Sequence, residues 1–196
     1  GTVSGSGVLN TSSNAEFIFQ TPGASTTLTL NVPLGGVLSP TTGGLTKGGE
    51  GTLVLNGGYN SYTGNTVLNL GTLQFGTNAP VFNPILYKFA TVPTAVSSYG
   101  TTPNANDLNV NPGATLDLNG KSLLTGNLFT SGATSTLPMT GGSVTNSNNT
   151  TVSDFITMPN AARDFAGQIS GNINFYKTSS SSQALSLRSG NIYTGS

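Results

Sequence analysis

The sequence predicts an all-β protein and, within that class, a parallel β-solenoid, a fold in which short strands wind into stacked coils. Residues 43–76 contain three apolar runs of three or four residues, separated by corners rich in glycine and asparagine. Such runs are too short for helices, and the corner residues favour turns. Three short strands cannot bury their apolar side chains alone, so the unit must stack on further copies of itself.

An antiparallel sandwich or jelly roll is the competing all-β architecture. It requires strands nearer five or six residues, joined by hairpin turns. The unit at residues 43–76 fits the solenoid better, because it spans three strands and ends where a following unit can begin. Coils of roughly 20 to 30 residues would give about seven turns. At a spacing of about 4.8 Å, these turns would form a body roughly 30 to 35 Å tall.

The N-terminal part is expected to contribute short strands of the same kind. Residues 26–32 read TTLTLNV, an alternation that places Leu28, Leu30 and Val32 on one face. Strands are expected around residue 3 and over residues 7–9, 16–20 and 26–32.

Residues 77–107 depart from the repeat pattern. They carry four of the ten prolines and the aromatic residues Phe82, Tyr87, Phe89 and Tyr99. A loop of this length is uncommon unless it is functional. We interpret it as an insertion that leaves the stack, either as a strap folded back over the solenoid or as an exposed interface. These four aromatic side chains are the candidate partner contacts.

Repeat character returns after the insertion and continues to the end, so residues 1–196 are expected to form a single solenoid domain. Short strands are expected between residues 108 and 146, at LNV, TLDL, SLL, NLF, TLPM and SVT. Residues 151–167 are interpreted as a second loop excursion, with a helical turn at NAARDF. The last residues echo the opening unit, which would place Leu185 and Leu187 like Leu53 and Leu55, and Tyr193 like Tyr62.

The core candidates are the apolar residues of these short runs. Burial of each would contribute roughly 1.5 to 3 kcal/mol before entropy is counted. Outward threonines and asparagines are expected to form hydrogen-bonded ladders between turns. The core candidates are Leu53, Leu55, Val67, Leu68, Leu70, Leu73, Phe75, Leu116, Leu118 and Leu128.

Composition argues against several function classes. Charged residues make up only 6% of the chain and the net charge is zero, so attraction to nucleic acid or to an anionic membrane is not supported. Histidine and cysteine are absent, which excludes catalytic triads, zinc sites and thiol nucleophiles within this sequence. No apolar stretch approaches the roughly 20 residues needed to span a bilayer. No cofactor or metal is expected.

The few acidic residues give weak candidates for chemistry. A β-helix that cleaves polysaccharides needs clustered carboxylates, and Asp154, Asp164 and Arg163 form the one such cluster in the sequence. A surface salt bridge or a turn cap is the more common role for such residues. Asp107 and Asp117 are oxygen donors that calcium accepts, but each fits a turn position better. We therefore expect no catalytic residues and no enzyme activity.

The segment 43–76 resembles the autotransporter-associated β-strand repeat, also called the passenger-associated transport repeat. Residues 111–120, NPGATLDLNG, resemble a run that often follows this repeat. The residues that carry the resemblance are Gly44, Leu45, Lys47, Gly49, Gly51, Thr52, Leu53, Leu55, Tyr62, Thr63, Gly64, Gly71, Thr72 and Leu73.

This resemblance implies a right-handed parallel β-helix in a large secreted or surface-exposed bacterial protein. It implies a stalk or passenger, and the repeat is linked to export and folding; it carries over no catalytic residues. The first hypothesis is therefore a structural segment of a longer chain: a stalk, adhesin scaffold or filament unit that self-associates or continues into further repeats. The alternatives are a carbohydrate-binding or carbohydrate-cleaving module, with a surface glycan or protein as partner, and an export element that assists passenger folding.

Overall fold

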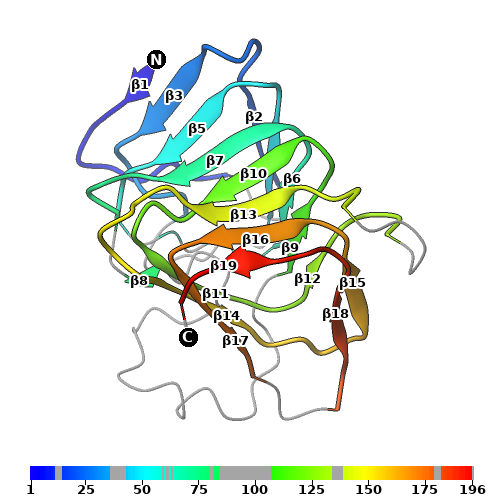
Figure 1. Ribbon diagram of the computed structural model, residues 1–196. Coiled ribbons are helices and arrows are strands. Elements are labelled where there is room, and N and C mark those ends of the chain that lie inside the picture. Colours follow the sequence, from blue (N-terminus) through cyan, green and yellow to red (C-terminus); the bar gives the residue numbers. More distant parts are fainter. Residues whose placement is uncertain are drawn as a thin grey trace.

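The computed structural model describes residues 1–11, 15–35, 43–58, 60, 62, 64–79, 82–83, 107–133, 139–178 and 182–195. Within these residues every regular element is a β-strand, and every strand pairing is parallel. The strands form three faces of one stack, which Figure 1 shows from the side of the largest sheet. The prediction of an all-β parallel β-solenoid is confirmed; the right hand of the coil stays a prediction.

The first face is an eight-stranded sheet that runs the whole length of the stack. In Figure 1 its strands lie in sequence order, from β1 beside the N-terminus to β19 near the C-terminus. These strands are β1 (Thr2–Val3), β3 (Thr27–Leu30), β5 (Thr52–Leu55), β7 (Gly71–Phe75), β10 (Ala114–Asp117), β13 (Ser143–Asn146), β16 (Gln168–Gly171) and β19 (Ile192–Tyr193).

The second and third faces complete each coil. The second face contains β8 (Phe82–Asn83), β11 (Ser122–Thr125), β14 (Ser153–Thr157) and β17 (Ile173–Lys177). The third face contains β2 (Phe17–Gln20), β4 (Leu45–Gly48), β6 (Thr66–Leu68), β9 (Leu108–Val110) and β12 (Leu128–Phe129), followed by the separate pair β15 (Arg163–Phe165) and β18 (Leu185–Leu187). A hydrogen bond of 3.1 Å from the Thr130 amide to the Asp164 carbonyl joins the two groups.

Coil length follows from the register of the first face, and it varies along the stack. Thr52 pairs with Thr72, which makes this coil a short one, whereas the coil in which Thr115 pairs with Ser143 is longer. Gln74 pairs with Asp117, far along the chain, because the segment 77–107 is inserted in this coil. The strands that flank the insertion keep their places in the stack, so it interrupts the chain without breaking the register.

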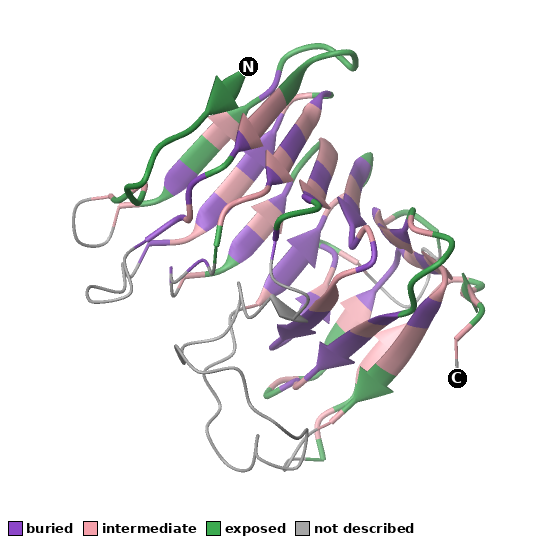
Figure 2. Cartoon of the chain, turned by 90° about the vertical axis from the view of Figure 1, so that its left-hand side faces the viewer, coloured by how far each residue is buried: buried purple, intermediate pink, exposed green. Residues whose placement is uncertain are grey.

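The core is a set of columns in which equivalent side chains of successive coils lie one above another. Leu53, Leu73, Leu116, Val144 and Ile169 occupy successive pairing positions and are all fully buried or nearly so. Figure 2 shows buried and more exposed positions alternating along these strands, as expected for strands with one face toward the core.

Two of the predicted core residues are not in the core. Val67 is half-buried, because the alternation within β6 turns Thr66 and Leu68 inward and Val67 outward. Leu70 is 38% exposed and lies at the corner before β7, where its Cδ1 covers Gly113 of the next coil. The other eight predicted core residues are buried: Leu53, Leu55, Leu68, Leu73, Phe75, Leu116, Leu118 and Leu128.

The segment 151–167 does not leave the stack, so the prediction of a second loop excursion is wrong. It contributes β14 to the second face and β15 to the third, and NAARDF runs through a bend into β15 with no helical turn. Phe155 and Phe165 are fully buried, and the Phe155 ring lies 5.6 Å from that of Phe175 in the next coil. Burying these two rings outweighs the local turn preference of the proline and asparagine between them.

The prediction that the C-terminal residues lie in the same places as their counterparts in the opening unit is wrong. Leu185 and Leu187 belong to β18 on the third face, whereas Leu53 and Leu55 belong to β5 on the first. Tyr193 lies in β19 on the first face, paired with Gly171, and is not placed like Tyr62. The predicted strand TLPM falls largely on residues 134–138, outside the described residues.

The predicted ladders of hydroxyl and amide side chains are confirmed at several positions. The outward column of the first face begins with Thr27, Thr52, Thr72 and Thr115 and continues to Ser143. Asparagines connect the corners of successive coils, with Asn111 Nδ2 2.8 Å from Asn69 Oδ1 and Asn56 Nδ2 2.7 Å from Asn31 Oδ1.

Replacement of Gly71 by alanine should destabilise the stack. Gly71 has φ of 70°, and a Cβ there would lie 2.4 Å from the carbonyl oxygens of Gly49 and Gly51 in the preceding coil. We expect Gly71→Ala to lower the free energy of unfolding by about 2 kcal/mol or more, from left-handed strain and backbone collision together. Chemical denaturation measures this. Gly58→Ala is the control, since a Cβ at Gly58 meets nothing within 4 Å; an equal loss in both variants would contradict the prediction.

Candidate functional site

The repeat residues form about one and a half coils near the N-terminal end of the stack. Leu45 and Lys47 lie in β4, and Gly44 and Gly51 flank that strand and β5. Thr52, Leu53 and Leu55 lie in β5, while Gly71, Thr72 and Leu73 begin β7. Tyr62 and Gly64 lie in the link between β5 and β6; Thr63 is outside the described residues. The motif is therefore spread over the first and third faces and the corners that join them.

Lys47 is the least expected member of this set, because its side chain is fully buried. In the register of the third face it stands between Phe19 and Leu68, in a column that otherwise carries apolar side chains. Its Nζ donates hydrogen bonds to the carbonyl oxygens of Gly48 at 3.0 Å, Gly49 at 2.7 Å and Leu70 at 2.9 Å.

These three bonds tie two coils together at one corner. Gly48 ends β4 and Gly49 begins the corner after it, whereas Leu70 belongs to the equivalent corner after β6, one coil further on. Burial lowers the pKa of the Lys47 ammonium, because desolvation disfavours its charge. Three carbonyl acceptors compensate for this cost with charge-assisted hydrogen bonds. Lys47 thus connects successive corners from inside the stack.

Tyr62 fills the interior beside this corner. Its side chain is fully buried, its hydroxyl lies 2.7 Å from Thr66 Oγ1, and its ring meets that of Phe17 edge-on at 6.3 Å. Burial raises the pKa of the Tyr62 hydroxyl well above its ordinary value, and the Thr66 hydrogen bond opposes this only in part. The residue connects the coil of β6 to that of β2 through aromatic packing.

Two glycines of the motif are needed for the close approach of backbones. A Cβ on Gly64 would lie 2.4 Å from the Gly44 amide nitrogen, so these positions stack glycine on glycine in successive coils. The Gly64 amide also donates to the Gly43 carbonyl at 3.1 Å. Only a residue without a side chain allows this spacing.

The strand β4 (Leu45–Gly48) was not among the three strands predicted for residues 43–76. The signal for it was the alternation of Leu45 and Lys47 on one side of the chain. This signal is weak, because charged side chains are almost never fully buried and a lysine is therefore not expected to face the core.

Of the four candidate partner contacts in the insertion, only the backbone of Phe82 lies among the described residues. Phe82 lies in β8, which pairs with β11 at Ser122. The side chain of Phe82 and all of Tyr87, Phe89 and Tyr99 lie outside the described residues. Both predictions for the insertion, a strap folded over the solenoid or an exposed interface, therefore stay predictions.

The acidic cluster proposed for carbohydrate cleavage is not assembled. Asp154 lies in β14 on the second face, where Asn174 Nδ2 donates to its Oδ1 at 2.9 Å. Asp164 lies in β15 on the third face and forms an ion pair of 2.5 Å with Arg188. Each carboxylate has its own structural partner, so the paired carboxylates of a glycosidase are not formed by these two residues.

Asp107 lies in the corner before β9, as predicted, whereas Asp117 is the last residue of β10 and not a turn residue. Asp107 Oδ1 accepts hydrogen bonds from the backbone and side chain of Asn127 at 3.0 and 2.8 Å. Both oxygens of Asp117 are occupied, among others by Gln74 Nε2 at 2.6 Å and by the backbone and hydroxyl of Ser147 at 3.0 and 2.7 Å. Among the described residues no three or more acidic, histidine or cysteine side chains are grouped to hold a metal ion.

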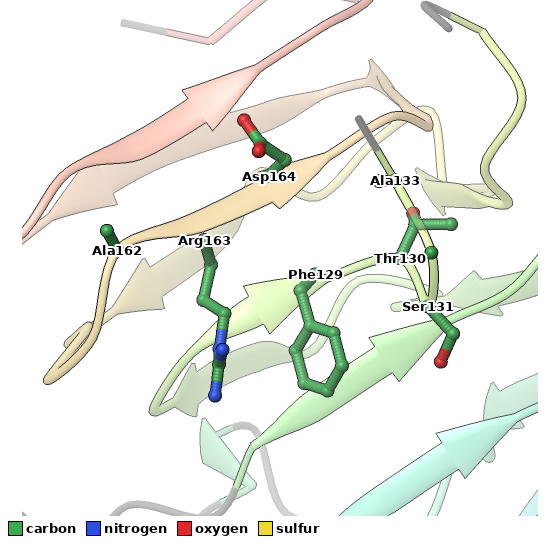
Figure 3. Close-up of a pocket in the computed structure, with 8 residues that line it drawn as sticks. Phe129, Thr130, Ser131, Ala133, Ala162, Arg163 and Asp164 are labelled. Atoms are coloured by element: carbon green, nitrogen blue, oxygen red, sulfur yellow. The ribbon is translucent and has the colours of Figure 1, made fainter. Parts of the chain in front are cut away.

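A pocket of about 380 Å³ lies where β12 meets β15 on the third face. Phe129, Ser131, Arg163 and Asp164 contribute to its lining. Figure 3 shows the Phe129 ring and the Arg163 guanidinium extending to the same side, with Asp164 pointing away. Arg163 was predicted to lie with the acidic residues, and nothing in the sequence indicates its pairing with Phe129, because the two residues are far apart along the chain.

The geometry thus defines a parallel β-solenoid whose recurring residues build corners and contacts between coils. Residues 45–75 match the family model of the passenger-associated-transport-repeat, which confirms the resemblance over this segment. Neither the curated proteins nor the solved structures give a match to the chain. In the described part of the chain no helix has the length and apolar character to cross a membrane.

Replacement of Lys47 by methionine should weaken the stack. The thioether keeps the apolar stem but leaves the Gly49 and Leu70 carbonyls without the hydrogen bonds that Lys47 donates. We expect Lys47→Met to lower the free energy of unfolding by about 1 to 3 kcal/mol in chemical denaturation. Lys177→Met, at an exposed position, should change it by less than about 0.5 kcal/mol. A Lys47→Met protein as stable as the wild type would mean that desolvating the ammonium costs as much as its bonds contribute.

Tyr62 should make the fold sensitive to alkaline pH. Above pH 10 the unfolded chain releases the proton of this hydroxyl, while the folded state, whose pKa is raised, retains it. Tyr62 therefore makes its full contribution to the free energy of unfolding below pH 10. As the pH rises further, this free energy falls by up to about 1.4 kcal/mol per pH unit. Denaturation between pH 9 and 11 should show a shallower fall for Tyr62→Phe than for the wild type. Tyr176→Phe, at an exposed tyrosine, should keep the wild-type fall; identical curves for the wild type and Tyr62→Phe would refute this role.

Proposed function

We propose that this chain is a non-enzymatic structural segment of an extracellular bacterial surface protein, in which stacked coils form a stalk or scaffold. The observation that carries the proposal is the use made of the repeat residues. Lys47 and Tyr62 are fully buried and bind neighbouring coils, and the motif glycines allow the coils to approach. A motif whose distinctive side chains point into the stack serves assembly of the stack rather than contact with a ligand.

The sides of the stack support the same proposal. One outward column of the first face carries threonine or serine from β3 to β13, and the charged residues of the chain are few. Such a face lacks the dense charge that attracts nucleic acid or anionic lipid. The match of residues 45–75 to a repeat named for passenger transport supports a secreted or surface-exposed location.

The outer strands of the stack favour further association. Within the described residues, β1 at one end and β19 at the other each pair on one side only. Ile192 in β19 is 63% exposed, and both residues of β1 are exposed. Unpaired strand edges with exposed apolar side chains favour pairing with another strand. We propose that further coils, in a longer chain or in a second copy, pair with these edges.

An export role is a second candidate, and the family match at residues 45–75 favours it. Under this proposal the repeat assists translocation or folding of the passenger, so its removal would reduce the amount that reaches the surface. Under the scaffold proposal, the stack tolerates the loss of one whole coil.

Deletion of residues 52–71 distinguishes the two candidates. It removes one whole coil and joins Gly51 to Thr72, so that Leu73 takes the place of Leu53 above Leu28. In the parent protein in its native host, the scaffold proposal expects surface levels within about two-fold of the wild type, by immunogold labelling and protease shaving. A stack that folds but no longer reaches the surface supports the export role instead. Deletion of residues 52–61 is the control, because half a coil destroys the register and should abolish folding. A parent protein found in the cytoplasm would overturn both proposals.

A further inference from the structure

The pocket between β12 and β15 lies on the side of the stack, and we propose that it binds the carboxylate of an acidic sugar. This inference does not depend on the structural function proposed above. It rests on the state of three groups at the pocket: a positive charge without an acidic partner, an aromatic ring that holds it in place, and a hydroxyl that can donate a hydrogen bond.

Arg163 supplies the charge. Its side chain is exposed, and its Cζ lies 5.2 Å from the centroid of the Phe129 ring. In Figure 3 the two groups lie side by side at the pocket. Stacking on an aromatic face restricts the guanidinium without using its N–H donors. A guanidinium held this way presents the planar pair of donors that binds a carboxylate with two parallel hydrogen bonds.

The nearest acidic residue does not neutralise this charge. Asp164 also lines the pocket, but in Figure 3 its carboxylate points away from Arg163 and Phe129. It is held by Arg188, whose Nε lies 2.7 Å from its Oδ1. Asp164 and Arg188 therefore balance each other. Among the described residues no carboxylate forms an ion pair with Arg163, so an external anion meets an uncompensated cation.

Ser131 supplies a second polar group. Its Oγ accepts a hydrogen bond of 2.6 Å from Asn109 Nδ2, and its amide donates to the side-chain oxygens of Asn109 and Asn111. These bonds fix the residue, and its hydroxyl donates no hydrogen bond to another described residue. The hydroxyl can therefore donate to a ligand that Arg163 anchors.

The surroundings favour a sugar acid over other anions. A nucleic acid or a sulfated polymer needs several basic groups in a row, and the chain has six lysines and arginines in all. One cation suits one carboxylate. A volume of about 380 Å³ is at the lower end of ligand pockets and has room for a small ligand such as one or two sugar rings. The Phe129 ring and the Ser131 hydroxyl are suited to the apolar and hydroxyl groups of a sugar ring.

The test uses trigalacturonic acid and sialyllactose as probes, with the methyl ester of each as its neutral comparison. We expect at least one acidic probe to bind, measured by calorimetry and by saturation transfer to its ring protons. The ester of a probe that binds should bind about ten-fold more weakly or worse, because it lacks the charge that Arg163 meets. Failure of both acidic probes to bind, or equal binding of the acidic probe that binds and its ester, would overturn the proposal.

Variants locate the site. Arg163→Gln should weaken binding of the acidic probe about ten-fold or more, and Phe129→Leu should weaken it by a smaller factor, since the guanidinium loses its stacking partner. Lys177→Gln removes the same charge at an exposed position on β17 and should leave affinity unchanged. Equal losses in Arg163→Gln and Lys177→Gln would show non-specific attraction and overturn the proposal. The comparison of acid with ester uses the unmodified protein, so it decides the question even if a variant fails to fold.

Discussion

The parallel register between successive coils is the constraint on which the rest of the structure depends. Because each strand pairs with its equivalent in the next coil, a residue meets the same kind of residue above and below it. Leu53 meets Leu73, and Thr52 meets Thr72. The interior therefore needs apolar side chains in columns, and the exterior can use hydrogen-bonded hydroxyls and amides in place of charges, which would repel when stacked in columns of one sign. The 6% content of charged residues is consistent with this constraint.

Corners are the places where this register must be maintained without strand pairing, and the chain does so in two ways. Asparagine and aspartate side chains connect some corners: Asn127 Nδ2 donates to Asp107 Oδ1 and to Asn160 Oδ1, and so joins three coils. Lys47 connects another corner from inside, with an ammonium that donates to three carbonyls. The asparagine ladder needs no positive charge to be removed from water. Lys47 donates to three acceptors and Asn127 Nδ2 to two, but burying the Lys47 ammonium costs free energy.

The sequence could predict the strands and the stacking, because both follow from the alternation of leucines and the short length of the runs. It could not assign strands to faces. Leu185 and Leu187 look like Leu53 and Leu55 but lie on another face. Coils differ in length even outside the insertion, so sequence position does not fix the face. The loop signals in residues 151–167 were misleading for a related reason: whether Phe155 and Phe165 are buried depends on the coils above and below them. The pocket was missed because its two main side chains meet only after the coils have stacked.

Regular stacking produces even surfaces, and specific surface features arise where the regularity is interrupted. The third face is one such place, since β15 and β18 form a pair separate from the five-stranded sheet that ends at β12. The coil that leads from β10 to β13, in which Thr115 pairs with Ser143, is also longer than the coil that leads from β5 to β7. Phe129 and Arg163 lie on the two sides of this interruption, and the pocket lies between their strands. A solenoid can therefore keep its core columns intact and acquire a binding site at a discontinuity of a single face, because the two other faces maintain the register across it.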